Sequence, residues 1–165
     1  MAKFNLELAE EKTRILEFGR FAVENRKARG EGKPETFSFL GFTFYCSTDS
    51  HKRFFRVKVK TDRKKVISKL KKLNIWLKEH RHYRLKDMIE RINQSLRGHY
   101  QYYGVTDNTR NVERFLLLVT RLLFKWLNRR SQRRSYNWET FNSRVLAIFP
   151  LLRPKITVSL SYRTA

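Results

Sequence analysis

The chain has 165 residues, of which 41% are hydrophobic and 14% aromatic, so it is long enough to bury a core and is not a disordered basic tail. Lys and Arg number 37 against 15 Asp and Glu, which gives a net charge of +22. Because such a charge opposes folding by self-repulsion, we expect a polyanionic partner. The accompanying aromatic residues favour RNA, whose unstacked bases pack on rings.

The chain carries a single cysteine, Cys46, which excludes an intrachain disulfide and a zinc finger. No apolar run approaches the roughly 18 residues of a membrane span, and the run at 115–124 is interrupted by Arg121. Residues 1–14 contain acids and no apolar h-region, so we expect no signal peptide. These features predict a cytoplasmic protein without a membrane contact, a cofactor or a metal.

The N-terminal third reads as extended segments joined by loops. Alternation around residues 13–18 predicts a short strand, and the basic, glycine-containing stretch 19–34 predicts a long loop. Apolar residues at 37–44 change phase at Gly41, which predicts a strand with either a bulge or a close backbone approach there. Alternation over 53–61 predicts the second strand of a β-hairpin, whose basic outer face either is simply solvated or contacts phosphate.

Helical periodicity begins at about residue 61. A capping residue at 61 or 62 predicts a helix that ends near His80, and its one-sided positive charge favours phosphate contact. A second helix is predicted over 85–103, with Gly104 as its C′ residue. Gly98 inside this helix costs about 1 kcal/mol relative to Ala. We therefore expect a close neighbour there, preferably another helix and otherwise a nucleic-acid backbone.

The next predicted helix, over 112–130, is the most apolar element. Arg114, Arg121 and Lys125 fall in a narrow arc opposite its apolar side, so we expect a mostly buried helix that exposes a basic stripe. A further helix is predicted over about 138–149, followed by a short extended end. The predicted fold class is α+β, with a small N-terminal β-hairpin followed by a bundle of about four helices.

Four elements stand out along the chain: the Lys-Thr pair at 12–13, the FLGF strand at 39–42, the Arg-Gly-aromatic helix at 92–104 and the arginine-rich turn within 127–141. They occur in the order found in group II intron-encoded reverse transcriptases, and the chain resembles the C-terminal part of that family. The resemblance implies that residues 1–60 are the end of the polymerase palm. It also implies that residues 61–165 are the maturase-specific domain, also called domain X or thumb.

In that family the Lys-Thr element lies near the incoming nucleotide, the FLGF strand positions the primer end, and the thumb clasps the template–primer duplex and the intron RNA. The resemblance thus implies a primer- and nucleotide-side remnant consisting of Lys12, Phe39, Leu40, Gly41 and Phe42. The residues that we expect to contact RNA are Arg63, Lys64, Lys65, Arg91, Arg97, Gly98, Tyr102, Arg114, Arg121, Lys125, Arg129, Arg130, Arg133 and Arg134.

The family's polymerase needs two metal ions held by aspartates, usually in a Tyr-Ala-Asp-Asp turn. The chain has four aspartates, Asp49, Asp62, Asp87 and Asp107, and no such turn. We therefore expect the chain by itself to be no enzyme. The predicted function is that of an RNA-binding maturase domain that binds group II intron RNA and assists its splicing. Target DNA or a template–primer duplex is a further expected partner.

Two alternatives stay open at the level of sequence. In the first, the chain is the C-terminal subunit of a split RNA-directed DNA polymerase, active only when a separate N-terminal reverse transcriptase chain supplies the aspartates. In the second, it is a generic basic protein, associated with ribosomes or DNA, that shows no preference for intron RNA. The four elements in family order rank this second alternative last.

Overall fold

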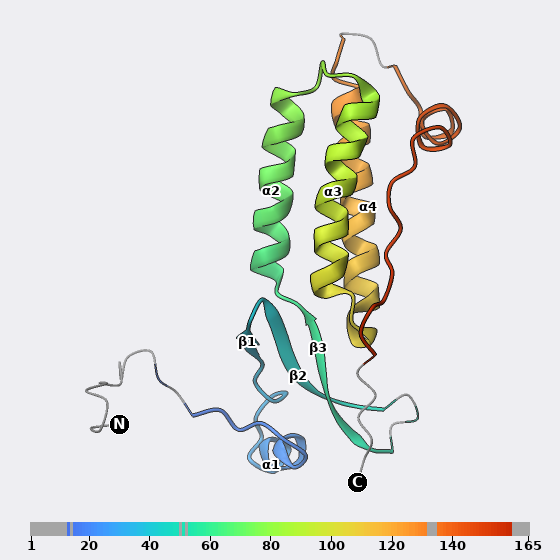
Figure 1. Ribbon diagram of the computed structural model, residues 1–165. Coiled ribbons are helices and arrows are strands. Elements are labelled where there is room, and N and C mark those ends of the chain that lie inside the picture. The colour runs from blue at the N-terminus through green and yellow to red at the C-terminus, as the bar shows by residue number, and fades with distance from the viewer. Residues whose placement is uncertain (1–12, 14, 50, 52, 132–134, 160–165) are drawn as a thin grey trace, which may run out of the picture. The chain divides into compact units, whose positions relative to one another are not determined.

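The computed structural model describes residues 13, 15–49, 51, 53–131 and 135–159, and the fold class is α+β, as predicted. A three-stranded antiparallel sheet is followed along the chain by helices (Figure 1). The chain divides into two compact units, residues 1–39 with 43–58, and residues 40–42 with 59–165.

The first unit contains a short helix, α1 (Ala22–Ala28), where the sequence predicted a loop. That prediction was wrong because Gly30 lies directly after the C-terminal end of a helix and not within a loop. At its φ of +71° the amide of Gly30 donates to the carbonyl of Lys27, and the next amide donates to the carbonyl of Arg26. These two hydrogen bonds form a Schellman motif. The strand predicted around residues 13–18 is also absent, since residues 15–18 have no regular structure.

Acids and bases of the first unit neutralise one another locally. The guanidinium of Arg29 donates to Glu17 and Glu31, and it is the main cause that holds the pKa of both carboxyl groups below the usual range. Arg26 pairs with Glu31 at 3.3 Å and with Glu35 at 3.9 Å. Because these groups are exposed or only partly buried, the pairs add little stability. Their consequence is that Glu17, Glu31 and Glu35 are engaged with arginines of the same unit.

The sheet has the order β1-β2-β3, with β1 at Phe37–Phe39, β2 at Phe42–Thr48 and β3 at Phe55–Thr61. The predicted β2–β3 hairpin is confirmed. The phase shift at Gly41 is not a bulge, because Leu40 and Gly41 form a two-residue turn with φ values of +47° and +76°. Positive φ at both central residues is the geometry of a type I′ hairpin turn, which fits the twist of the flanking strands.

Replacing Leu40 by Asn is expected to raise the free energy of unfolding by about 1 kcal/mol. An ordinary L-residue pays roughly 1–2 kcal/mol for the left-handed conformation, whereas Asn tolerates it. Leu40 is 67% exposed, so little packing is lost. Urea unfolding measures the gain, and Leu40→Ala, which keeps the backbone penalty, is the control. A Leu40→Asn variant no more stable than the Leu40→Ala variant would contradict the turn geometry.

Three long helices make up most of the second unit. They are α2 (Arg63–Glu79), α3 (Leu85–Tyr103) and α4 (Thr109–Leu127), and they lie side by side (Figure 1). The predicted cap of the first is confirmed, since the Asp62 side chain accepts from the amide of Lys64 at 2.7 Å. The predicted bounds of α3 are also confirmed. α4 begins three residues earlier than predicted because a 3-10 turn, Thr106–Asn108, leads into it.

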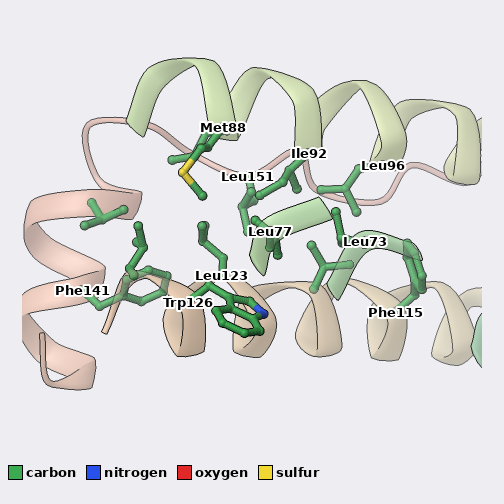
Figure 2. Packing of buried hydrophobic residues seen from close by; sticks show 14 of the residues in the cluster. Leu73, Leu77, Met88, Ile92, Leu96, Phe115, Leu123, Trp126, Phe141 and Leu151 are labelled. Carbon is green, nitrogen blue, oxygen red and sulfur yellow. The ribbon is translucent and has the colours of Figure 1, made fainter. Parts of the chain in front are cut away.

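The apolar stripes of the three helices meet in one core. Figure 2 shows side chains of α2, α3 and α4 pointing toward one another. Phe141 and Leu151, which follow α4 in the chain, belong to the same cluster. The labelled members are Leu73, Leu77, Met88, Ile92, Leu96, Phe115, Leu123, Trp126, Phe141 and Leu151. Burial of the apolar surface of these side chains on folding is the main contribution to stability. It also fixes which faces of the helices remain exposed.

After α4 the chain forms α5 (Trp138–Phe141), which continues as a π-helical turn, Asn142–Leu146. The predicted start of this helix is confirmed, and Asn137 and Thr140 form a capping box there. The helix ends before Pro150, as predicted, but its second half is π-helical. The chain then runs back along the helices (Figure 1).

Gly104 marks the place where this returning segment meets the end of α3. Its φ of −76° shows that the predicted left-handed C′ role was wrong. A Cβ at this position would lie 2.4 Å from the carbonyl oxygen of Tyr100 and 2.7 Å from that of Lys155. The glycine is therefore needed for a close approach, which allows Val105 and Val158 to form a parallel bridge.

Candidate nucleic-acid interface

α4 presents a row of exposed cations on the side opposite to its buried residues. We define the α4 stripe as the four cations Arg110, Arg114, Arg121 and Lys125 together with Leu117, which lies between them. All five residues are exposed. The members are spaced three or four residues apart, so they share one face of the helix. At 1.5 Å per residue the row is about 22 Å long. The sequence missed Arg110, although its position four residues before Arg114 was the available signal.

The C-terminal end of α4 separates two arginines that the sequence treated alike. Arg129 is exposed, and its guanidinium lies 5.5 Å from the ring centroid of Trp126. Arg130 instead donates to the carbonyl of Tyr83 at 3.0 Å and contacts the sulfur of Met88, and burial lowers its pKa. Arg130 therefore joins the α2–α3 connection to the end of α4. The predicted residues Lys12, Arg133 and Arg134 lie outside the described part of the chain.

An exposed aromatic ring flanks the α4 stripe. Trp138 is 44% exposed and stacks on Phe124 of α4, with ring centroids 4.0 Å apart and an interplanar angle of 10°. A stacked, partly exposed tryptophan is a surface on which an unpaired base can pack. Trp138 was not among the expected RNA-binding residues. Its position directly after the arginine-rich turn was the signal that could have found it.

Three of the expected primer-side residues, Leu40, Gly41 and Phe42, contact the end of α3. The hydroxyl of Tyr102 donates to the carbonyl of Leu40 at 2.6 Å, and its ring stacks on Phe42. A Cβ at Gly41 would lie 2.7 Å from the hydroxyl oxygen of Tyr103, so the alternative of a close approach at this glycine is confirmed. Phe39 belongs to β1 and is 59% exposed.

A buried asparagine holds the ends of three elements together. The side chain of Asn108 accepts from the amide of Thr61 at 2.8 Å, and it donates to the hydroxyl of Thr61 and to the carbonyl of Tyr103. Asn108 is fully buried. Because all these groups would otherwise be unsatisfied, they fix the end of β3, the end of α3 and the start of α4. Nothing in the local sequence indicated this role.

The other expected RNA-binding residues lie on α2 and α3. Arg63, Lys64 and Lys65 are exposed in the first turn of α2, which contains no acid. Arg91 and Arg97 are both exposed on α3, but six residues of an α-helix turn through about 600°, so they point roughly 120° apart. The expected residues are thus spread over several faces of the bundle.

Gly98 is exposed in the interior of α3, and no helix packs against it. A Cβ placed there meets no atom within 4 Å, so the expected helix contact is wrong. The other alternative for this position, close approach of a nucleic-acid backbone, stays a prediction.

Replacing Gly98 by Ala is expected to raise the free energy of unfolding by up to about 1 kcal/mol, because helical Gly costs that much relative to Ala and the space is open. Chemical denaturation measures the change. Gly104→Ala is the matched control and is expected to destabilise, since its Cβ would lie 2.4 Å from a backbone oxygen. A loss of stability in the Gly98→Ala variant would show that the position is not open.

His99 is an unusual member of the core. It is 1% exposed, its ring stacks on Phe115 with centroids 3.8 Å apart, and neither ring nitrogen has a hydrogen-bond partner in the described structure. Burial, assisted by the positive charge of Lys69, lowers the pKa of His99 to about 4. The side chain is therefore neutral at pH 7 and acts as a flat core residue.

Within the described ranges, no cluster of three or more His, Cys, Asp or Glu side chains could hold a metal ion. The same residues include no helix that is both long and apolar enough to cross a membrane.

A basic helical bundle with an exposed row of cations and flanking aromatic rings is typical of domains that bind nucleic acids. Residues 63–143, which run from the first residue of α2 into the π-helical turn, match the family described as group II intron, maturase-specific domain. The match supports a group II intron maturase C-terminal region over these residues. Searches of curated proteins and of solved structures returned no match.

Proposed function

We propose that the chain binds group II intron RNA through the basic faces of its helical unit and assists the RNA to reach its splicing-competent fold. The observation that carries this proposal is the α4 stripe, an exposed row of cations within a maturase-specific domain. Cations that contact phosphates release the counterions condensed on the RNA, which drives binding. Arg dominates the stripe, and its planar fork suits bidentate contact with phosphate.

The proposal includes the division of the chain. Residues 61–165 are the maturase-specific domain, and residues 1–60 are the end of a reverse transcriptase palm whose primer-side turn is Leu40–Phe42. The hydrogen bond between Tyr102 and Leu40 supports this, because it joins that turn to the end of α3, one of the proposed RNA-binding helices. The proposed location is the cytoplasm, since the single thiol, Cys46, fits a reducing compartment.

A binding and splicing assay tests the proposal. The purified chain is titrated with a group II intron RNA and with an unrelated structured RNA of equal length, each at several salt concentrations. We expect tighter binding to the intron RNA, a linear fall of log affinity with log salt, and faster splicing of the intron at low magnesium. Equal affinity for the two RNAs at every salt concentration would instead support a generic basic protein.

One observation favours the second function, that of a C-terminal subunit of a split polymerase. In the described part of the first unit the only buried hydrophobic residue is Ala22. Several large apolar side chains there are exposed, as expected for a palm fragment that lacks its partner strands: Ile15, Phe21, Val23, Phe39 and Phe54. Large apolar side chains left exposed in this way fit a contact with another chain.

Co-expression with a separate N-terminal reverse transcriptase chain, followed by primer extension, tests this second function. Nucleotide incorporation by the mixture and not by either chain alone would support a split enzyme. Binding of intron RNA without incorporation by the mixture would leave the maturase role as the function. Incorporation by this chain alone would contradict both.

A further inference from the structure

A groove of about 450 Å³ lies between α2 and α3. Its lining combines positive charge, amide and hydroxyl groups and one large ring. The residues are Lys69, Lys72 and Trp76 from α2, and Arg91, Gln94 and Ser95 from α3, over a floor formed by Leu73. No carboxylate is among them. Arg91 alone of this set was expected to contact RNA, and the rest became apparent only from the packing of the two helices.

Helical spacing explains why these residues meet. Positions 69, 72 and 76 follow one another at three and four residues, so they lie on one side of α2, and 91 and 95 do the same on α3. The ammonium group of Lys69 donates to the carbonyl of Ser95 at 3.1 Å and joins the two walls. On the other side of α2, Asn74 accepts from the indole of Trp126 of α4 at 2.9 Å. The groove therefore opens away from α4.

The charge in the groove is not balanced by acids. In the described chain, Lys69, Lys72 and Arg91 make no ion pair with a carboxylate. Burial lowers the pKa of Lys69, and no negative neighbour counteracts this. Arg91 donates to the side-chain oxygen of Gln94 at 2.6 Å, which holds both side chains at the rim. Three cations without counter-charges around a cavity favour an anionic ligand.

We propose that this groove binds one unstacked nucleotide of a single-stranded segment of the RNA, with the phosphate between Lys72 and Arg91 and the base against Trp76 and Gln94. This inference rests on the proposed function and adds a second RNA contact to the α4 stripe. Single strands supply a phosphate and an unpaired base together, which is what a cationic groove with a ring and an amide recognises. A cavity of a few hundred Å³ is large enough for a small organic ligand.

Gly98 supplies the path by which the strand leaves the groove. It lies seven residues after Arg91, on the same side of α3, and space beyond it is open. A side chain at this position would narrow the exit. The interior glycine, despite its cost of about 1 kcal/mol relative to Ala, thus leaves room for an RNA backbone on this side of α3.

The first test compares two charge-matched double variants. Lys72→Ala with Arg91→Ala removes two cations from the groove, whereas Lys71→Ala with Lys86→Ala removes two exposed cations of the same helices that do not line it. Because the first pair no longer neutralises phosphate, affinity for a ten-nucleotide single-stranded RNA is expected to fall roughly 25-fold at about 0.1 M salt. The control pair should change it less than threefold. Equal losses in both variants would overturn the proposal.

The second test changes shape without charge. Gly98→Leu adds bulk on an exposed helical site that favours helix formers, so the fold is retained and thermal unfolding verifies it. Binding of the single strand is expected to weaken about tenfold. The wild-type chain should likewise bind a single strand with one abasic site about tenfold more weakly when the missing base is that of the bound nucleotide. Unchanged binding of both would exclude a nucleotide in the groove.

These tests separate the groove from the general proposal. If the wild-type chain prefers intron RNA and the groove variants bind the short single strand as the wild type does, the groove inference fails and the maturase proposal stands. If the wild-type chain does not prefer intron RNA, the proposed function fails. A photo-cross-link from a 4-thiouridine strand to a peptide containing Trp76 or Gln94 would support the groove directly, and cross-links confined to α4 would contradict it.

Discussion

Replacing Arg114, Arg121 and Lys125 by Ala in one variant is expected to lower the affinity for intron RNA on the order of 10²-fold at about 0.1 M salt. Each phosphate contact contributes roughly 0.7–0.9 to the slope of log affinity against log salt, so that slope should fall by about 2–3. The three side chains are exposed, and the stability of the fold should change little. Fluorescence anisotropy of labelled intron RNA at four salt concentrations measures both quantities.

A second triple variant controls for net charge. Lys71, Lys78 and Lys86 are exposed lysines of α2 and α3 outside the expected interface, and their replacement by Ala lowers the net charge equally. We expect this variant to keep most of the affinity and most of the salt slope. If the two variants lose affinity equally, the chain binds RNA through its overall charge and the α4 stripe has no special role.

Lowering the pH from about 6.5 to about 4 is expected to reduce the free energy of unfolding of the wild-type chain by about 3 kcal/mol more than that of a His99→Phe variant. The pKa of His99 is lowered from 6.5 to about 4, first by burial and then by the charge of Lys69. Between these values the unfolded chain takes up a proton that the folded chain does not bind, so stability falls as the pH falls. Above about 6.5 the group is neutral in both states, and below about 4 it is protonated in both.

The magnitude follows from about 1.36 kcal/mol for each pKa unit. Phe at position 99 keeps an aromatic ring against Phe115 and removes two nitrogens that have no hydrogen-bond partner in the described structure. Carboxyl groups titrate equally in both proteins, so the difference between their denaturation curves isolates His99. His82→Gln, a change of an exposed histidine, should retain the full wild-type pH dependence. Parallel curves for wild type and His99→Phe would contradict the assignment.

Features that depend on nearby residues were predicted well. The bounds of α3 and the cap at Asp62 follow from helical periodicity and capping chemistry, which act within a few residues. The exposed face of α4 follows from the same periodicity. The misses at Gly30 and at Leu40–Gly41 were also local. The pattern predicted a loop residue where Gly30 forms a Schellman motif. At Gly41 it predicted either a bulge or a close approach, and the type I′ turn was missed because Leu40 occupies a position that normally carries Asn or Gly.

The candidate sites could be predicted only in part, because a list of cations does not show which of them are engaged. Arg130 looked equivalent to Arg129, yet it contacts Tyr83 and Met88 across the end of the bundle. In the sequence, Lys69 and Lys72 were two members of a one-sided charge run that favoured phosphate contact but indicated no particular site. They became part of a groove once Ser95 and Arg91 were placed opposite them.

The amino-acid sequence by itself determined the three long helices, their apolar and basic faces, and the resemblance to group II intron maturases, since each of these is encoded by neighbouring residues or by their order. The tertiary structure alone decided that the Asn108 side chain hydrogen-bonds to the end of β3 and the end of α3. It also decided that Gly98 faces open space and that α2 and α3 enclose a cationic groove. The physical reason is that periodicity fixes the orientation of a residue on its own helix. The neighbour that it meets is fixed by packing between residues far apart in the chain.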